Sequence, residues 1–354
     1  MTVTASRPVP SMKYVPQLDG LRAVAIIMVF LHHAFNIPLL WAGVDLFFIL
    51  SGYLITNILL RDCETLSFRK MIGKFYLRRA ERILPAYTVF LLLVLLLDRK
   101  DLLHIWPYFV TFLQNIPFAF HFVPWGPLVP LWSLAVEQHF YLVWPVVVYY
   151  LPRPWLVPCM VALLFLEPVL RAVCTPLFST SEAIYCLTPF RLDAMAAGAL
   201  AALLLPHCKP LRTVRWAQAA VFCGTLIYAL LSLHPWFRRQ ANSMAFNSLA
   251  YSFNLLILGG LFVWTVLSRD TLLTRLLSSR PLRGLGRISY MFYLLHLGVL
   301  IAVGSHFGPL AAAPIAFALT TLLATLSWFA IEKPILALSS AHRRAAPQTP
   351  VVTP

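Results

Sequence analysis

The chain has 354 residues, of which 60% are hydrophobic, 14% aromatic and only 12% charged, and this composition excludes a water-soluble globular domain. The formal net charge of +15 is compatible with nucleic-acid binding, but the Lys and Arg residues lie in short segments between apolar runs, as charges that set membrane topology do. We therefore expect an all-α polytopic membrane protein that contacts membrane lipids and no nucleic acid.

Eleven apolar segments approach the length of about 20 residues that a membrane-crossing helix needs. They lie near 21–40, 42–60, 83–97, 104–123, 131–151, 155–174, 187–205, 216–233, 249–267, 287–304 and 309–331. The basic segments 61–82, 206–215 and 268–287 are expected to be loops, and these loops and the basic tail are expected in the cytoplasm. An even number of crossings must separate neighbouring basic segments, so one of the five apolar segments between the first two does not cross. The polar 104–123 is the weakest, although 83–97 is short and begins beside Pro85. The sequence predicts about ten transmembrane helices with cytoplasmic N- and C-termini.

The two ends of the chain differ in composition from the apolar region between them. Residues 1–17 lack the apolar stretch of a secretory signal, so we expect a cytoplasmic N-terminal segment and an uncleaved first span. Residues 18–335 are expected to form one integral membrane domain, and the Pro-, Ala- and Thr-rich residues 336–354 a disordered cytoplasmic tail. The six cysteines form no C-x-x-C pair and no His/Cys cluster, so we predict neither a disulfide framework nor a metal site.

Arg22 and His33 share the first apolar segment, LDGLRAVAIIMVFLHHAF. Eleven residues of helix turn through about 1100°, so both side chains lie on one face, separated by about 16 Å along the axis. We expect Arg22 near the membrane surface and His33 at about mid-depth. Ionisable groups inside a membrane are candidates for function.

Asp45 begins the second apolar segment, GVDLFFILSGYLIT, after a short linker from His33. A carboxylate there could orient the imidazole and stabilise its protonated form. It could equally be an acid that interacts with the dipole at a helix N-terminus. Both interpretations stay open.

Three arginines, Arg78, Arg79 and Arg82, lie in FYLRRAERILPAY beside the third apolar segment. Guanidinium groups suit phosphate because they form bidentate hydrogen bonds. Without further information, a role in topology or lipid-headgroup contact is the favoured interpretation.

Glu137 lies at the head of the segment LWSLAVEQHFYLVWP, on the same helical face as Ser133. An acid at this position needs a partner or a water-filled cavity. Other polar residues in or beside apolar segments are more typical of structural roles when taken singly: Trp132, His139, Arg191, Asp193, His296, Glu332 and Lys333. Their joint occurrence is stronger evidence for a site.

Six motifs in order resemble the membrane-bound acyltransferase family 3, the bacterial O-acyltransferases. They are LDGLRAVAIIMVFLHH, GVDLFFILSGYLIT, FYLRRAERILPAY, LWSLAVEQHFYLVWP, RLDAMAAGAL and ISYMFYLLH, and the resemblance runs from about Leu18 to Lys333. It implies that Arg22 and His33 form the catalytic signature and that Arg79 and Arg82 contact the acyl-coenzyme A (acyl-CoA) donor. It also favours Asp45 and Glu137 as site residues. Many relatives carry a C-terminal SGNH-type hydrolase domain. Because this chain stops at its tail, we expect any second transfer step made by such a domain to be absent.

The resemblance implies acyl transfer from cytoplasmic acyl-CoA, expected to be acetyl-CoA, to a hydroxyl of a glycan, glycolipid or hydrophobic natural product. The expected location is the bacterial cytoplasmic (inner) membrane. His33 would be a general base or a transient acyl carrier, oriented by Asp45. Arg22 would stabilise charge on the thioester oxygen or a donor phosphate, and the arginines at 78–82 would hold phosphates. No metal is required.

The alternative is a proton-coupled transporter or lipid flippase, in which Arg22, His33, Asp45 and Glu137 would form a proton relay and anion path. The internal repeat with paired broken helices that is typical of such proteins is not visible in the sequence.

Overall fold

The computed structural model describes residues 14–97, 99–122 and 126–338, and these are helical with no β-strand. The helices are α1 (Pro16–Phe35), α2 (Gly43–Thr65), α3 (Phe68–Leu97), α4 (Arg99–Val110), α5 (Asn115–Ala119), α6 (Leu131–Tyr150), α7 (Arg153–Cys174), α8 (Glu182–Cys186), α9 (Leu192–Leu204), α10 (Pro210–Ser232), α11 (Met244–Leu267), α12 (Leu272–Leu277), α13 (Arg280–Arg287), α14 (Ser289–Gly304) and α15 (Pro309–Ser327). A π-helical turn, Trp328–Glu332, continues α15. The all-α prediction is confirmed for this part of the chain. Most of the predicted N-terminal segment and tail lies outside the described residues.

Seven of the described helices are long and apolar enough to cross a membrane: α1, α2, α3, α7, α10, α11 and α15. Helices α13 and α14, bent by 76°, make an eighth if they form one span. Two predicted spans fall short of this standard. Helix α9 has 13 residues and is only about 20 Å long, and α6 carries Glu137, Gln138 and His139. The predicted count of ten is not confirmed, and the orientation of the termini stays a prediction.

The apolar segment 104–123, which the sequence marks as the weakest span, does not form one helix. It is divided between α4 and α5, and the backbone at Phe112 between them is left-handed, with φ of 55°. The competing segment 83–97 is instead the C-terminal half of the continuous helix α3.

The predicted basic loop 61–82 is wrong as a loop, because it consists of the end of α2 and the N-terminal half of α3. Only Leu66 and Ser67 separate the two helices. With 30 residues, α3 is about 45 Å long, whereas the hydrocarbon core of a membrane is about 30 Å thick. The excess length allows the basic half of α3 to extend beyond this core.

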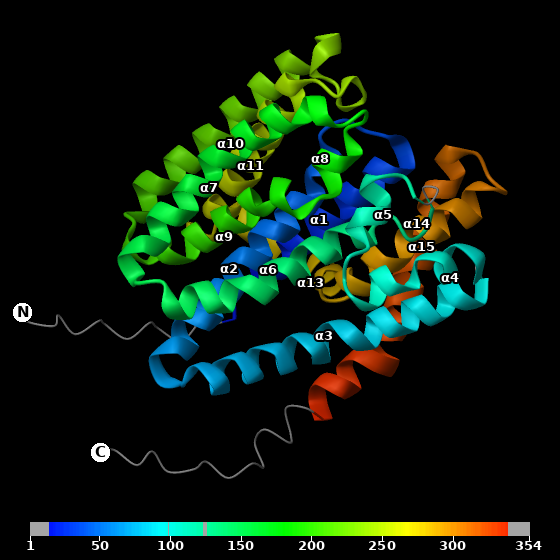
Figure 1. Ribbon diagram of the computed structural model, residues 1–354, viewed down its shortest axis with the longest axis horizontal. Helices are drawn as coiled ribbons and strands as arrows, with labels where there is room; N and C mark the ends of the chain where they lie inside the picture. The colour runs from blue at the N-terminus through cyan, green and yellow to red at the C-terminus, as the bar shows by residue number, and fades with distance from the viewer. Residues whose placement is uncertain (1–13, 98, 123–125, 339–354) are drawn as a thin grey trace, which may run out of the picture.

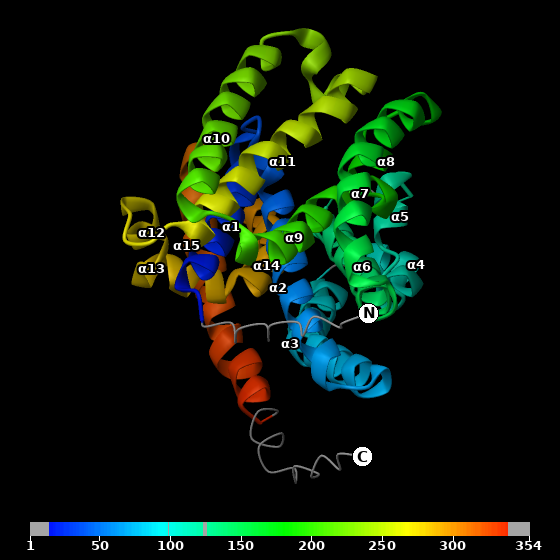
Figure 2. The ribbon, with the colours of Figure 1, turned by 90° about the vertical axis from the view of Figure 1, so that its left-hand side faces the viewer.

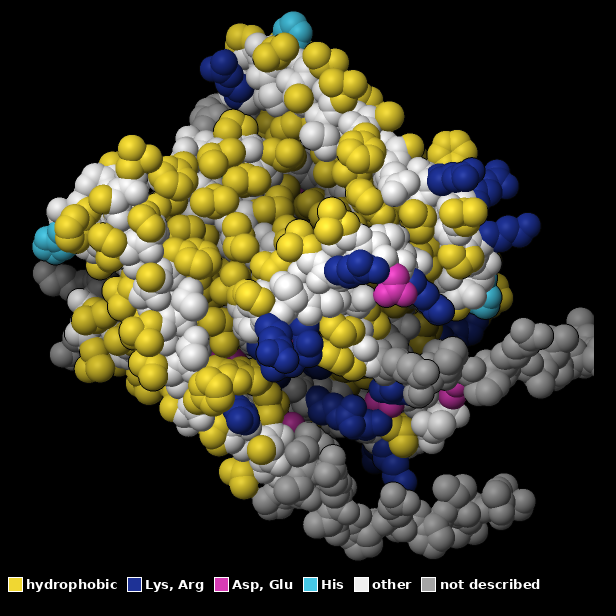
Figure 3. Space-filling model, turned by 180° about the vertical axis from the view of Figure 1, so that it is seen from behind, with side chains coloured by type: hydrophobic (Ala, Val, Ile, Leu, Met, Phe, Trp, Pro, Cys, Tyr) yellow, Lys and Arg dark blue, Asp and Glu magenta, His cyan; other side chains and the backbone are white. Residues whose placement is uncertain are grey.

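Helices α1 and α2 lie near the middle of the bundle, between α10 and α11 on one side and α14 and α15 on the other (Figure 1). Helix α3 runs across the lower part of the bundle in Figure 1 and again lies low, seen nearly end-on, in Figure 2. One face is largely apolar, and many of its Lys and Arg side chains gather at the same lower end (Figure 3). The middle of this face is thus apolar, and we call the lower end, where α3 lies, the basic end.

Helices α2 and α9 pack through glycines. A Cβ atom on Gly198 would overlap the carbonyl oxygen of Ile49, and one on Gly52 would overlap that of Met195. Small residues allow such close approach of helices inside a membrane.

We expect Gly198→Ala to lower the melting temperature of the detergent-solubilised protein, because the added methyl group must push α9 away from α2. Gly259→Ala in α11 is the matched control, since a Cβ atom there meets nothing within 4 Å. That variant should keep or raise the melting temperature, since alanine is favoured over glycine in a helix by about 1 kcal/mol. Equal melting temperatures for the two variants would contradict this account of the α2–α9 contact.

Candidate functional site

A cavity of about 310 Å³ lies between α1, α2, α3, α6 and α14. Its apolar lining includes Val44, Phe47, Phe48 and Leu294. Its polar lining residues are Tyr14, Asp19, Arg22, Ser51, Arg79, Arg82, Ser133, Glu137, Tyr141, Ser289, Tyr290 and Tyr293. Five of the six predicted motifs, which are far apart in the chain, therefore meet in one space.

Arg22 is fixed in the cavity wall by a carboxylate one turn earlier on α1. Its Nη1 lies 3.1 Å from Oδ1 of Asp19, and the hydroxyl of Tyr14 donates to the other oxygen of Asp19 at 2.6 Å. The Arg22 side chain is 17% exposed. The guanidinium is thus held in place but remains open to a ligand in the cavity.

Arg79 and Arg82 enter the same cavity from α3, where they lie one turn apart. The guanidinium of Arg79 packs over the ring of Phe75 at 5.9 Å, and its Nε is buried with no hydrogen-bond partner among the described residues. Arg82 is exposed. Arg78, which the sequence grouped with them, is not among the lining residues. The lining thus contains three arginines and two acids, which favours an anionic ligand.

Glu137 shares the cavity with Ser133 and Tyr141, which are one turn away on either side of it on α6. The predicted common face of α6 is therefore present. The hydroxyl of Ser51 donates to Glu137, and Tyr141 donates to Ser51 Oγ at 3.2 Å. From the sequence, Glu137 was expected to have either a partner or a cavity. In the structure it has both, a hydrogen bond from Ser51 and a place in the cavity wall.

His33 lies away from this cavity, in the last turn of α1, and its side chain is exposed. It is not among the lining residues, which fits the rise of about 16 Å between residues 22 and 33. Its Nδ1 is 2.9 Å from the carbonyl oxygen of Val29 and 3.1 Å from Nε2 of His296. Its expected position at about mid-depth in the membrane stays a prediction, while along the helix His33 lies two residues before the end of α1 at Phe35.

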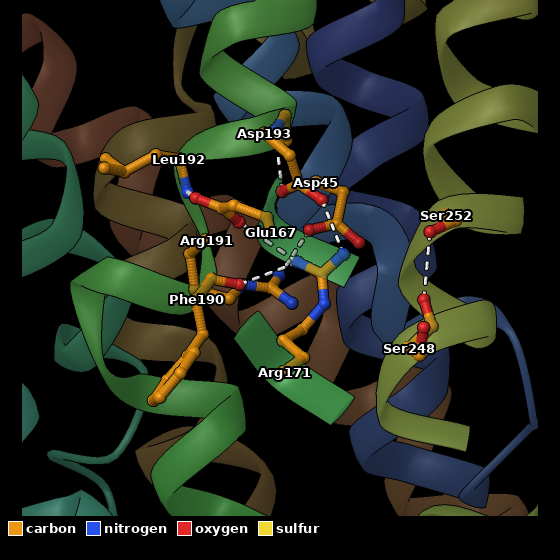
Figure 4. Close-up of polar contacts among 10 residues, drawn as sticks. Asp45, Glu167, Arg171, Phe190, Arg191, Leu192, Asp193, Ser248 and Ser252 are labelled. Carbon is orange, nitrogen blue, oxygen red and sulfur yellow. Dashed lines mark hydrogen bonds and ion pairs between the residues drawn. The ribbon is translucent and has the colours of Figure 1, made fainter. Parts of the chain in front are cut away.

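Asp45 does not contact His33. It lies buried in the first turn of α2, as a helix N-terminal acid would, and forms an ion pair with Arg191 (Figure 4). Arg191 is almost fully buried, and its guanidinium packs over the ring of Tyr251 at 4.7 Å and that of Tyr185 at 5.3 Å. The expected orientation of His33 by Asp45 is therefore not formed. The carboxylate balances a buried arginine instead.

A second buried arginine extends this group. Arg171 donates to Glu167 at 3.1 Å, to Asp193 at 2.9 Å and to the carbonyl oxygen of Phe190 at 2.9 Å (Figure 4). We call Asp45, Glu167, Arg171, Arg191 and Asp193 the buried ion cluster. It ties α2, α7 and the start of α9 together. Sequence analysis missed Glu167 and Arg171, although an acid and an arginine four residues apart in an apolar segment are themselves a signal.

Sequence analysis also missed Ser51, Tyr141 and Tyr293 in the cavity, because hydroxyl groups carry no charge that stands out in an apolar run. Among the weaker candidates, His139 bonds Thr188 at 2.6 Å, and Lys333 packs over Phe329 at 5.1 Å. Neither residue lines the cavity. Within residues 14–97, 99–122 and 126–338, no group of three or more His, Cys, Asp or Glu side chains could hold a metal ion.

Comparison with known proteins identifies relatives over nearly the whole chain. Residues 15–333 match the model of an acyltransferase domain, that of the acyltransferase 3 family. The chain is 31% identical to the peptidoglycan O-acetyltransferase OatA of Listeria monocytogenes, over 81% of this chain and 49% of that protein. It is 32% identical to a Bacillus subtilis protein named "Putative peptidoglycan O-acetyltransferase YrhL", over 91% of this chain and 55% of that protein.

A third relative, named "Putative O-acetyltransferase" in Staphylococcus aureus (strain COL), is 28% identical over 91% of this chain and 57% of its own length. The chain thus spans about half the length of the curated relatives it matches. No solved structure matches it significantly. With its ordered motifs, its helical bundle and a family model that covers residues 15–333, the chain belongs to the acyltransferase 3 family.

Proposed function

We propose that this protein is an O-acyltransferase that transfers an acyl group from acyl-CoA to a hydroxyl of a glycan. The proposed acyl group is acetyl. The observation that carries the proposal is the cavity in which Arg22, Arg79 and Arg82 converge from α1 and α3. The relatives named as peptidoglycan O-acetyltransferases support a peptidoglycan-type acceptor and an acetyl group. The bacterial cytoplasmic membrane is the proposed location, with the basic end in the cytoplasm.

The arginines would hold the phosphates of the donor. Arg79 and Arg82 both line the cavity, and Arg82 is exposed where a large polar nucleotide could reach it. Arginine suits phosphate because its planar guanidinium forms bidentate, charge-assisted hydrogen bonds. Arg22 lies in the same cavity as both of these residues and far from His33, which supports a phosphate rather than the thioester oxygen as its ligand.

His33 would act on the acceptor at the other end of α1. Its Nε2 would take the proton of the acceptor hydroxyl while that oxygen attacks the thioester carbonyl. The carbon–sulfur bond then breaks, and the leaving coenzyme A thiolate takes up the proton that Nε2 of His33 removed from the hydroxyl, which returns His33 to its neutral form. Since Arg22 and His33 are about 16 Å apart along α1, the donor would bind extended, with its phosphates and its thioester at different heights.

Incubation of the purified protein with labelled acetyl-CoA and a muropeptide acceptor tests this proposal. We expect release of free coenzyme A thiol, measured with a chromogenic thiol reagent, together with acceptor-dependent transfer of label. A transporter would release no thiol. Absence of both signals from folded protein would overturn the proposal.

Arg82→Lys is expected to raise the Michaelis constant for acyl-CoA about ten- to a hundredfold, because losing a charge-assisted contact costs about 1.5–3 kcal/mol. Lysine keeps the charge but loses the planar fork. The constant for the acceptor should stay nearly unchanged, and steady-state kinetics with each substrate varied in turn measures both. Arg69→Lys is the matched control, since Arg69 is exposed on the same helix and outside the cavity. If Arg79→Lys and Arg82→Lys both leave donor dependence unaltered, the arginines of α3 serve topology alone.

A further inference from the structure

We propose that His296 is the positioning residue for His33, in the place that the sequence assigned to Asp45. This inference rests on the proposed function, in which His33 is the base. Its evidence is a chain of hydrogen bonds that joins the two imidazoles to the wall of the cavity.

Two backbone carbonyls fix the protons of the imidazole pair. Nδ1 of His296 lies 2.6 Å from the carbonyl oxygen of Tyr293, and Nδ1 of His33 lies 2.9 Å from that of Val29. A carbonyl oxygen only accepts, so each Nδ1 carries a hydrogen. In the neutral rings each Nε2 is then an acceptor. His296 Nε2, 3.1 Å from His33 Nδ1, can therefore accept from the same N–H that faces Val29.

This arrangement leaves Nε2 of His33 as the unprotonated nitrogen. No described residue hydrogen-bonds to it, and the His33 side chain is exposed. A general base needs a free lone pair on an accessible atom, and a hydrogen bond to the opposite ring nitrogen is the usual device that provides it. The tautomer that the neighbours impose is thus the one that the chemistry requires.

The surroundings of His296 hold it in the orientation in which its Nε2 faces Nδ1 of His33. Its side chain has no solvent exposure, and its ring lies 5.0 Å from that of His33, centroid to centroid. Tyr293, one turn earlier on α14, lines the donor cavity and bonds to Ser133 at 2.7 Å. One turn of α14 therefore connects the donor cavity with the base. When His33 takes up a proton at Nε2, its Nδ1–H becomes a charge-assisted donor to His296, which strengthens the contact.

Two substitutions separate positioning from packing. His296→Gln places an amide oxygen near the position of Nε2 and can still accept from His33. His296→Asn places its amide near Nδ1, so it can bond to Tyr293 but not to His33. We expect His296→Asn to lower kcat about tenfold with an unchanged Michaelis constant for acetyl-CoA, as loss of one hydrogen bond predicts. His296→Gln should stay within about threefold of the original kcat.

Nitrogen-15 NMR of histidine-labelled protein provides a second measurement that does not depend on turnover. The original protein and His296→Gln should show His33 with its hydrogen on Nδ1, assigned by the signals lost in His33→Gln. His296→Asn should show a mixture of tautomers. If the original protein releases coenzyme A thiol but the two variants match in kcat and in the His33 signals, the positioning role is overturned and the proposed function stands. If the original protein releases no thiol, the proposed function itself fails.

Discussion

His33→Ala is expected to abolish acyl transfer, with a loss of about 10²–10⁴-fold, while the protein still inserts and folds. A positioned general base contributes this much to a rate, and a methyl group cannot replace it. Insertion should not suffer, since His33 is exposed at the end of α1 and takes no part in the buried ion cluster. Label transfer from acetyl-CoA, corrected for the amount of monodisperse protein, measures the effect.

His32→Ala is the matched control for this change. His32 follows the same helix but points about 100° away, and its Nδ1 bonds to the carbonyl oxygen of Ile37. This variant should retain most of the activity. An equal loss in both variants would show that this end of α1 matters for structure and that His33 is not the base.

Asp45→Ala should lower the free energy of unfolding by about 3–5 kcal/mol, because it leaves Arg191 charged and buried without its partner. Nε and Nη1 of Arg191 have no hydrogen-bond partner among the described residues. These two atoms therefore provide no hydrogen bond that could offset the lost ion pair with Asp45. The activity of the fraction that remains folded should fall far less than in His33→Ala. Denaturant unfolding in detergent micelles and specific activity together measure the two effects.

Two further variants test whether charge balance is the cause. The double substitution Asp45→Asn with Arg191→Met removes both charges and should recover most of the lost stability. Asp62→Ala breaks the pair with Lys74, whose side chain is 33% exposed, and should cost only about 1 kcal/mol. If Asp45→Ala unfolds no more easily than Asp62→Ala, the buried ion cluster is not a major source of stability.

The helical elements of this fold were largely predictable, because long apolar segments in a membrane have few alternatives to the helix. Helix α3 shows a limit of predicting helices and loops from hydropathy and charge. Charge marks residues 61–82 as cytoplasmic, but charge alone does not show that a segment is a loop, and these residues continue into an apolar helix. Helix α9 shows a second limit, since the apolar segment 187–205 forms a helix of only 13 residues, and hydropathy alone does not give the length of a helix.

Within the site, Ser133 and Glu137 were predicted to lie on one face of their helix, and α6 bears this out at the cavity. Pairs between helices could not be predicted from spacing. Asp45 and Arg191 are 146 residues apart, and His33 and His296 are 263 residues apart. Proximity in the chain suggested Asp45 as the partner of His33, but α2 begins against Ala25 and Met28 of α1, and Asp45 pairs with Arg191 at the start of α9.

Helix α3 is longer than the membrane core is thick, and this links the donor cavity to the lipid around it. In a membrane, the exposed Leu92, Leu93, Leu96 and Leu97 would anchor its C-terminal half in hydrocarbon, while Arg79 and Arg82 lie toward its basic half. A helix under hydrophobic mismatch tilts or shifts to match the bilayer. A change of bilayer thickness would then move these two arginines relative to Glu137 on α6. If these arginines hold the donor as proposed, the lipid composition of the host membrane would thereby become part of the geometry of donor binding.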